Sequence, residues 1–141
     1  MEPGKPAFNY LPYKVHNNIV YLAGQLAKEN GIVKNIGRVP EDITEVEASR
    51  QMSLCAIHAY AWLEIAAKNN NSEIESILDL KLYVSCKGNY DGISRLADFA
   101  SSIFIEKLGE SGKHPRSVLA VTRLPQNAPV MIDLRAALKF K

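Results

Sequence analysis

Two side chains in the C-terminal quarter of the chain have types and settings that suit the chemistry of small acids. Arg116 stands where a polar loop becomes a predicted strand, and its guanidinium could pair with both oxygens of a carboxylate. Asp133 interrupts an otherwise apolar strand, where burial would raise its pKa and let it handle a proton. Each also has a plainer interpretation. Arg116 could be a strand-end arginine in solvent, and Asp133 a solvated charge on an edge strand, which Arg135 two residues later supports.

Other polar residues offer weaker chemistry. Neutral His114 could accept a proton, or it could lie exposed in the loop before Pro115. The hydroxyl of Tyr13 could bind a substrate, or the ring could cover the edge of the core. Cys55 and His58 are three residues apart on a predicted helix, but two ligands are too few for a structural metal site. The sequence also lacks a phosphate-binding loop, a G-x-S-x-G motif and an H-E-x-x-H motif, so no standard motif assigns a reaction.

The elements that must position Arg116 and Asp133 are two predicted strands. Residues 116–122 and 130–136 alternate in side-chain character with a period of two, and the Pro- and Asn-bearing segment 124–129 lies between them. Such a pattern is typical of a β-hairpin. We therefore predict that the two strands pair with each other and carry both candidate side chains on a rigid sheet.

The rest of the chain predicts strands and helices in alternation. Thr44 and Glu47 form a capping-box pattern that opens a helix running to about Lys68, and Gly109 ends a second helix. A turn is expected at 28–31, and Leu78 is expected on the apolar side of its strand. The predicted strands are 13–15, 19–23, 32–33 and 77–85, and the second helix is 93–108. Helices that are apolar on one face and separated by strands predict a layered α/β sandwich.

Length and composition predict one domain, 1–141, with residues 1–8 as an extended N-terminal arm. The net charge is only +2, and no basic run is longer than two residues, so nucleic-acid binding is not demanded. The two cysteines, Cys55 and Cys86, fall in a predicted helix and a predicted strand, and reduced thiols suit the cytosol. Because no apolar run reaches membrane-spanning length, we expect a cytoplasmic protein without a membrane partner.

A longer pattern joins these pieces. It consists of Gly112-Lys113-His114-Pro115-Arg116-Ser117, then Leu124-Pro125 and Ile132-Asp133, with Asn9–Pro12 and Tyr21–Leu26 near the N-terminus. The chain resembles the YjgF/RidA family of reactive-intermediate deaminases, also called endoribonuclease L-PSP, and within it the branch with a G-K-H-x-R-S motif. The resemblance extends from about Asn9 to Phe140.

The resemblance implies a chorismate-mutase-like fold, in which a mixed sheet carries two helices on one face. It implies a homotrimer with a barrel-like core and a cleft between each pair of subunits. The implied activity is hydrolysis of 2-enamine and 2-imino acids, such as 2-aminoacrylate, to 2-oxo acids and ammonia. Neither a metal nor an organic cofactor is needed for that reaction.

The resemblance also implies roles for particular residues. Arg116 matches the arginine that binds the substrate carboxylate. Asp133 matches a glutamate that positions or activates water, and the aspartate side chain is one methylene shorter than that glutamate. Ala23 replaces a serine of an S-G-Q motif, and Pro115 replaces an alanine and should stiffen the approach to Arg116. The residues expected to line the substrate pocket are Tyr13, Gly24, Val118 and Asp98.

The sequence and the resemblance together suggest three alternative functions. The first is a 2-imino acid deaminase. The second is a non-catalytic trimer that binds small carboxylates, which the changes at Asp133 and Ala23 motivate. The third is an endoribonuclease, which rests on the family's alternative name alone. The near-neutral charge, and the lack of an aromatic-basic platform and of a histidine pair, argue against it.

Overall fold

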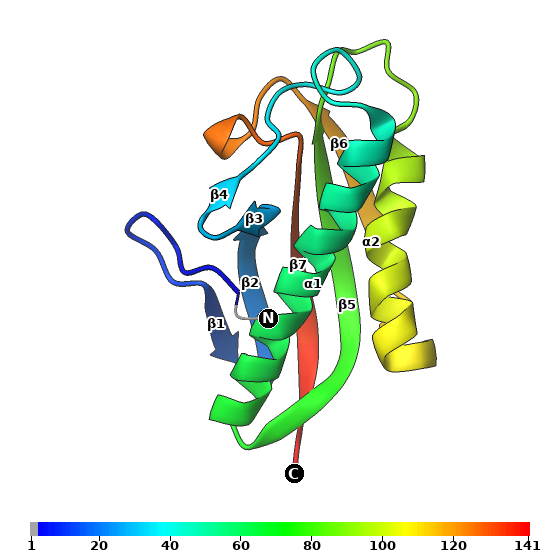
Figure 1. The fold of residues 1–141 in the computed structure, drawn as a ribbon. Helices are drawn as coiled ribbons and strands as arrows, with labels where there is room; N and C mark the ends of the chain where they lie inside the picture. Colours follow the sequence, from blue (N-terminus) through cyan, green and yellow to red (C-terminus); the bar gives the residue numbers. More distant parts are fainter. Residues whose placement is uncertain (1–2) are drawn as a thin grey trace.

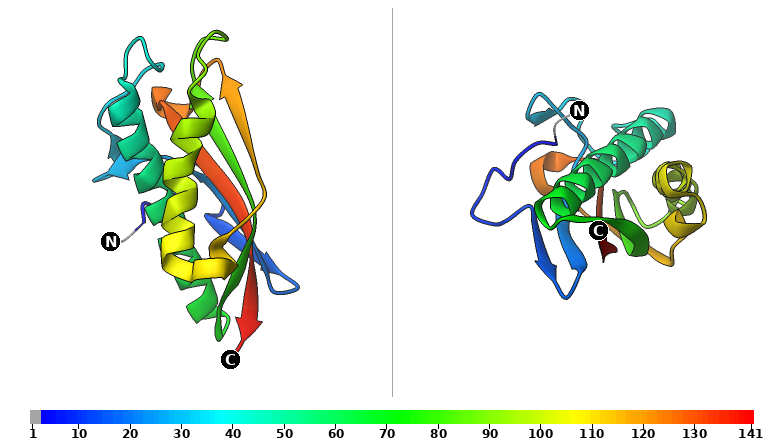
Figure 2. Two further views of the ribbon diagram at one scale, coloured as in Figure 1. Left: turned by 90° about the vertical axis from the view of Figure 1, so that its right-hand side faces the viewer. Right: turned by 90° about the horizontal axis from the view of Figure 1, so that it is seen from below.

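Five strands form one mixed sheet, and both helices pack against the same face of it (Figure 1 and Figure 2). The computed structural model describes residues 3–141. The strand order is β1-β2-β7-β5-β6, and within it only β5 and β6 are parallel neighbours. The elements are β1 (Tyr13–His16), β2 (Ile19–Gln25), α1 (Glu45–Asn69), β5 (Ser72–Ser85), α2 (Ile93–Leu108), β6 (Arg116–Val121) and β7 (Val130–Phe140). The predicted layered α/β fold is confirmed.

The helix ends lie where the sequence places them. The Thr44 hydroxyl accepts a hydrogen bond from the Glu47 backbone N–H at 3.1 Å, which caps the first turn of α1. At the other end Asn70 caps the helix and Asn71 adopts a left-handed conformation with φ of 49°. Gly109 ends α2 with φ of 61°, a backbone conformation that glycine adopts without strain.

The core lies between the helices and one face of the sheet. Helix α1 is apolar on one face, as predicted, and it buries the residues that recur there at helical spacing, namely Ala48, Met52, Cys55, Ala59, Trp62 and Ala66. Strand β7 supplies Val130, Ile132, Leu134 and Ala136, and α2 supplies Leu96, Ala97, Ala100 and Phe104. Each large side chain buried in this way contributes about 1.5–3 kcal/mol. The core therefore fixes the two helices against β7, β5 and β2, while the opposite face of the sheet carries neither helix.

The predicted hairpin of residues 116–136 is wrong. Strand β6 pairs in parallel with β5, and β7 pairs antiparallel with β5 on its other edge, so β5 separates the two strands. The segment between them folds over the end of the sheet, where Leu124 and Ala128 are buried in a small cluster with Val33. Alternation identifies which residues share a face of a strand, but it does not identify the strand's partner.

Strand β5 also departs from the prediction. It begins at Ser72, five residues before the predicted start, because its polar first half pairs with the end of β7 as far as Phe140. A β-bulge lies between Ile77 and Asp79, and it turns Leu78 outward, where 38% of that residue is exposed. Ile77 takes the buried position that the sequence analysis gave to Leu78.

Two shorter segments complete the fold. Lys28–Glu29 (β3), which was predicted as part of a turn, pairs with Ile32–Val33 (β4), and only the two residues between them form the turn. Residues 3–12 form neither helix nor strand, and the first two residues of the predicted N-terminal arm lie outside the described residues.

No helix within residues 3–141 is long and apolar enough to cross a membrane. Both cysteines are free and buried.

Candidate carboxylate-binding site

Arg116 is the first residue of β6, and its side chain lies against α2. One terminal nitrogen donates to the Ser101 hydroxyl at 2.9 Å and contacts the Asp98 carboxylate at 2.8 Å. The other terminal nitrogen donates to the backbone carbonyl of Ser94 at 3.2 Å. Ser94, Asp98 and Ser101 follow one another at helical spacing, so all three lie on the face of α2 that meets the strand. The Arg116 side chain is 24% exposed, and it is therefore both fixed in place and open to a ligand.

His114 holds the Ser101 hydroxyl in place, and through it the Arg116 guanidinium. Its Nδ1 lies 2.6 Å from the Gly112 carbonyl oxygen, which can only accept, so Nδ1 carries the hydrogen in the neutral ring. Nε2 then accepts from the Ser101 hydroxyl at 3.0 Å, and the Ser101 oxygen remains free to accept from Arg116. The imidazole also packs edge-on against Phe104, with ring centroids 6.0 Å apart. The result is a directed chain of hydrogen bonds that orients the guanidinium.

This chain of hydrogen bonds changes the interpretation of His114 and gives a role to serines on α2. His114 is neither an exposed loop residue nor a free proton acceptor, because both of its ring nitrogens have partners. The sequence analysis missed Ser94 and Ser101. Their signal was present in the polar spacing along α2, but it gained meaning only when β6 was known to lie beside that helix rather than in a hairpin with β7.

Asp98 supplies the carboxylate that contacts Arg116. Its side chain is 71% exposed, and within residues 3–141 Arg116 is its one charged partner. An ion pair this exposed contributes roughly 0–1 kcal/mol, so an incoming acid can displace it at little cost. The guanidinium keeps its neutral partners, Ser101 and the Ser94 carbonyl, when Asp98 moves away.

Asp133 lies on the other face of the sheet. Across the strands Arg116 stands beside Leu80 and Leu134, which face the helices, whereas Asp133 stands beside Lys81 on the opposite face. One carboxylate oxygen of Asp133 accepts from the Tyr83 hydroxyl at 2.7 Å. Burial, together with this hydrogen bond, raises the pKa of Tyr83 to about 12, so the phenol remains a donor at neutral pH. Within one chain, the predicted catalytic pair does not meet.

The remaining predicted pocket residues fall into two regions. Val118 is two residues beyond Arg116 on the same face of β6 and is partly buried against the core. Tyr13 packs against Trp62, with ring centroids 6.0 Å apart, and its hydroxyl accepts from the Asn69 amide at 3.0 Å. Tyr13 thus covers the edge of the core within the chain, as the plainer interpretation expected.

Gly24 lines a cavity of about 310 Å³ under the N-terminal arm. A Cβ at Gly24 would lie 2.8 Å from the Met131 sulfur, so a larger residue would displace the Met131 side chain. Of the six predicted site residues, the chain therefore gathers Arg116, Asp98 and Val118, and it places the others elsewhere. Within residues 3–141, no group of three or more acidic, histidine or cysteine side chains is arranged to hold a metal ion.

Comparisons with known proteins agree with this architecture. No family model matches the sequence. The protein TCP17 of Trypanosoma cruzi is 26% identical over 129 residues, which is 91% of this chain and 80% of that protein. The crystal structure of Atu1372 from Agrobacterium tumefaciens, a protein of unknown function, is 30% identical with a TM-score of 0.88, covering 96% of this chain and 86% of that one.

The YjgF gene product of Escherichia coli has a TM-score of 0.65 and is 18% identical, over 96% of this chain and 92% of that one. At this identity the likeness shows the fold, and the fold is the chorismate-mutase-like arrangement that the sequence analysis expected. The Agrobacterium protein is similar enough over most of both chains to be a member of one family with this protein. On its 30% identity to the Agrobacterium protein and on structural neighbours that include the YjgF gene product and a Rid-family protein of Yersinia pestis, the chain belongs to the YjgF/RidA family.

Proposed function

We propose that this protein is a deaminase that hydrolyses 2-imino acids, formed from enamines such as 2-aminoacrylate, to 2-oxo acids and ammonia. The observation that carries the proposal is the geometry of Arg116. Its guanidinium is held by neutral groups of α2 and is opposed by a single, exposed acid. A planar fork of this kind meets both oxygens of a carboxylate at once, which an ammonium group does not reproduce.

The proposed reaction asks little of the protein. The oxygen of a water molecule attacks C2 of the imine while one proton of the water passes to the nitrogen. The remaining hydroxyl proton also passes to the nitrogen as the C–N bond breaks, and ammonia and the 2-oxo acid leave. Imines hydrolyse in water unaided, so holding the carboxylate on Arg116 supplies orientation as the main contribution. Proton transfer through a positioned carboxylate would add roughly 10²–10⁴-fold.

Asp133 takes part in this proposal from a neighbouring copy of the chain. It faces away from the Arg116 side of its own sheet, so a homotrimer with clefts between subunits is the arrangement in which the two side chains could act together. The helix-free face supports association, because Tyr21 and Leu119 remain 42% and 43% exposed on it. Parallel strand pairs such as β5 and β6 are usually covered on both faces. Light scattering at micromolar concentration that gives a monomer near 15.6 kDa would contradict the trimer.

Measurement of turnover tests the proposed deaminase activity. A dehydratase generates 2-aminoacrylate in place, and ammonia or pyruvate release is followed with wild type, Arg116→Ala and Arg123→Ala. Arg123 is an exposed arginine on the loop after β6 and serves as the matched control. Wild type and Arg123→Ala should accelerate the reaction equally, and Arg116→Ala should fall to the rate without protein. Equal rates for wild type and Arg116→Ala would dismiss the proposal.

A second candidate is a trimer that binds small carboxylates without turnover. The separation of Asp133 from Arg116, and its hydrogen bond to Tyr83, favour it. A structural neighbour, TdcF of Escherichia coli, was crystallised with bound serine, which also carries a carboxylate. Binding of 2-oxobutyrate in the calorimeter by a protein that releases no ammonia would select this function, and no binding at millimolar ligand would dismiss it.

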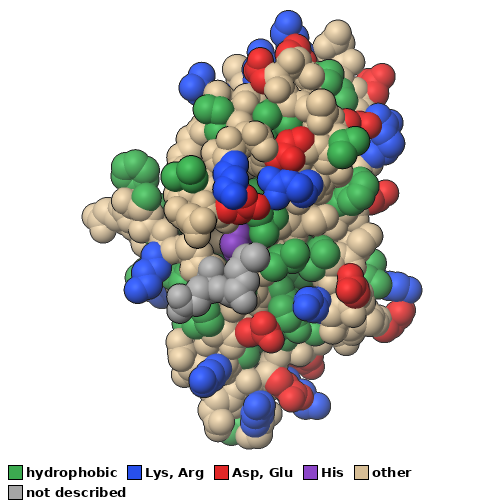
Figure 3. All heavy atoms as spheres, viewed as in Figure 1, with side chains coloured by type: hydrophobic (Ala, Val, Ile, Leu, Met, Phe, Trp, Pro, Cys, Tyr) green, Lys and Arg blue, Asp and Glu red, His purple; other side chains and the backbone are tan. Residues whose placement is uncertain are grey.

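The endoribonuclease name that some structural neighbours carry has less support here. The net charge is +2, and Figure 3 shows basic and acidic side chains intermingled on the face it displays. RNA binding ordinarily relies on a continuous basic surface. Cleavage of single-stranded RNA that follows the protein through purification and persists in Arg116→Ala would revive this function.

A further inference from the structure

The cavity that Gly24 lines belongs to the substrate pocket of the proposed function, and its size and walls indicate which substrate side chain would fit. Its volume is about 310 Å³. Apolar and aromatic side chains form much of its wall, among them Phe8, Leu26, Trp62 and Met131. An apolar cavity of about 150 Å³ is large enough to hold benzene. The cavity therefore has room for an aromatic ring or a branched chain, and a methyl group would leave most of it unfilled.

Strand β7 connects this cavity to Asp133. Met131 borders the cavity, and Asp133 is two residues further along the same strand. Both side chains therefore leave the sheet on its helix-free face, with Cα atoms roughly 7 Å apart. Tyr83, which donates to the Asp133 carboxylate at 2.7 Å, also packs with Met131 against the small buried cluster near Leu124. An imine carbon attacked by water at Asp133 would have the cavity beside it.

Gly24 and Met131 together form a wall that can adapt to a ligand. A Cβ at residue 24 would lie 2.8 Å from the Met131 sulfur, so the Met131 side chain lies directly over the glycine backbone. Methionine is unbranched and flexible, which lets it fit apolar groups of different shape. This wall offers apolar contact rather than a fixed polar partner, and it suits a hydrocarbon side chain.

Two lysines at the border of the cavity, Lys5 and Lys28, make an acidic side chain the competing class. Lys5 is exposed and Lys28 is half-buried. A pair of charges this close to solvent adds little affinity. Burial of a hydrocarbon side chain, in contrast, is favourable in proportion to the area removed from water. The walls therefore favour an apolar side chain over an acidic one.

We propose that the site prefers 2-imino acids, and the matching 2-oxo acids, that carry a bulky apolar side chain, either branched or aromatic. The carboxylate binds Arg116 of a neighbouring copy, the imine carbon lies beside Asp133, and the side chain enters the cavity next to Met131. This inference rests on the proposed function for its carboxylate anchor, and it goes further by naming the side chain of the substrate.

Binding of stable 2-oxo acids tests the side-chain class without turnover. The full chain is titrated in the calorimeter with pyruvate, 4-methyl-2-oxopentanoate, phenylpyruvate and 2-oxoglutarate. The branched or the aromatic acid should bind at least about tenfold more tightly than both pyruvate and 2-oxoglutarate, because a hydrophobic pocket discriminates by about this factor for even one methylene. Any other ranking, or no binding of the four acids at millimolar concentration, would overturn the inference.

Turnover separates a failure of this inference from a failure of the deaminase. An amino acid oxidase generates the 2-imino acids of alanine and leucine, and semicarbazide traps whatever the protein does not hydrolyse. Tight binding of the bulky 2-oxo acids without accelerated hydrolysis would refute the deaminase and leave the side-chain class standing. Accelerated hydrolysis with pyruvate as the tightest ligand would refute the side-chain class and leave the deaminase standing.

Variants then locate the side-chain pocket. Met131→Ala should reduce the ratio of phenylpyruvate to pyruvate affinity by at least about fivefold, and Phe8→Ala should reduce it by about threefold, because each removes apolar contact with the ring. Phe99→Ala, at a 47% exposed position on α2, is the control and should keep the ratio. An unchanged ratio in a folded Met131→Ala protein would overturn the assignment. If that variant does not fold, Phe8→Ala, at a 79% exposed position, decides the matter in the same way.

Discussion

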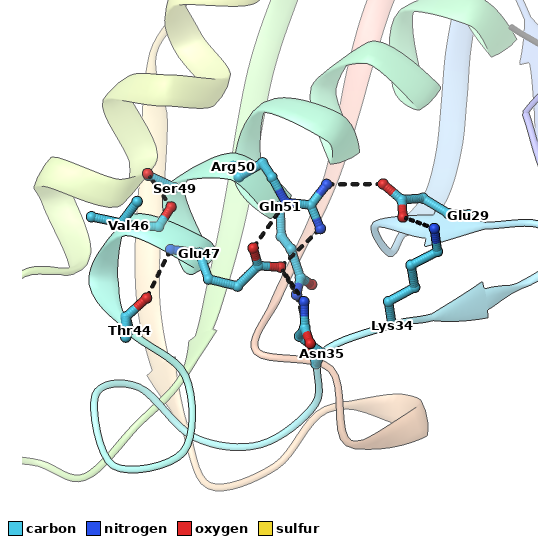
Figure 4. A network of polar contacts seen from close by, with 9 residues as sticks. All are labelled: Glu29, Lys34, Asn35, Thr44, Val46, Glu47, Ser49, Arg50 and Gln51. Atoms are coloured by element: carbon cyan, nitrogen blue, oxygen red, sulfur yellow. Dashed lines mark hydrogen bonds and ion pairs between the residues drawn. The ribbon is translucent and has the colours of Figure 1, made fainter.

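Two arginines in this protein are both paired with acids, and they differ in how easily the acid can be replaced. Arg50, in the first turns of α1, binds Glu47 through two nitrogens at 2.8–2.9 Å and Glu29 through the third at 2.9 Å (Figure 4). Arg116, at the start of β6, meets one acid, Asp98, which is mostly in solvent. Each of the three guanidinium nitrogens of Arg50 donates to a carboxylate, whereas Arg116 donates to two neutral groups besides its one acid.

Further hydrogen bonds hold the Glu47 carboxylate in place beside Arg50. Besides Arg50, the Glu47 carboxylate accepts from the side-chain amides of Asn35 and Gln51 at 3.0 Å each. The hydrogen bonds from Arg50, ahead of those from the two amides, lower the pKa of Glu47 to about 2. An incoming acid would have to break this network as a whole. The comparison therefore assigns Arg50 to holding the loop before α1 and the β3–β4 hairpin, and Arg116 to binding.

Alanine substitutions at the two arginines should separate these two roles, and they should have the largest effects of the variants considered. Arg116→Ala should lose at least about 100-fold in carboxylate affinity or in turnover, because it removes charge-assisted hydrogen bonds. It should change the free energy of unfolding by less than about 1 kcal/mol. Arg50→Ala should keep the affinity and lose about 1–2 kcal/mol of stability. Urea unfolding and calorimetry on both variants measure the contrast, and the reverse pattern would mean that the roles are exchanged.

Asp98→Asn should strengthen the binding of small carboxylates by roughly threefold to tenfold. The variant removes the charge that competes for Arg116 and keeps a side chain of the same shape at a 71% exposed position. Calorimetric titration with 2-oxobutyrate measures the change, with Asp91→Asn, in the loop before α2, as the control for lost surface charge. Weaker binding would show that Asp98 itself contacts the ligand, as the sequence analysis predicted.

Ser101→Ala should weaken carboxylate binding by about fivefold, which is the effect of one neutral hydrogen bond. The substitution leaves Arg116 without its shortest neutral contact and leaves His114 Nε2 without a donor. Ser101→Thr keeps the hydroxyl and should restore most of the affinity. If alanine at 101 has no effect, the hydrogen-bond chain through His114 does not position the guanidinium.

The smallest effect concerns acid stability at Glu47. Because its folded-state pKa lies near 2, below the ordinary value of 4.5, its stabilising contribution is present above about pH 4.5 and is lost as the pH falls toward 2. Glu47→Gln should therefore lose about 1 kcal/mol at neutral pH and less at pH 2–3. Thermal unfolding as a function of pH checks this, with Glu106→Gln, an exposed position on α2, as the control. The same loss at every pH would show that the charge is not responsible.

Much of the fold followed from local pattern, and the part that did not was non-local. The stripe of α1 and the alternation of β7 each depend on a single periodicity, and both proved correct. The pairing of β6 with β5 depends on contacts far apart in the sequence, so alternation alone could not distinguish it from a hairpin. Leu78 was misplaced because it is the extra, unpaired residue of the β-bulge, which interrupts the alternation between Ile77 and Leu80.

The candidate site was predictable in its residue types and less so in its arrangement. Arg116 was identified from its place at the start of a strand, and Asp98 from the family resemblance, and the two form an ion pair. The role of Ser101 could not be assigned from the polar spacing along α2, because a serine on a helix acquires such a role only from the element packed beside it. The separation of Asp133 from Arg116 followed from the strand order, which the sequence did not specify.

Calorimetric titration of 2-oxobutyrate into wild type, Arg116→Lys and Arg50→Lys tests the central claim most directly. Both variants keep the positive charge, and only the guanidinium fork is lost. Wild type and Arg50→Lys should bind with the same affinity, and Arg116→Lys should bind at least about tenfold more weakly. Unchanged affinity in Arg116→Lys, or a loss confined to Arg50→Lys, would contradict the assignment of Arg116 as the carboxylate anchor.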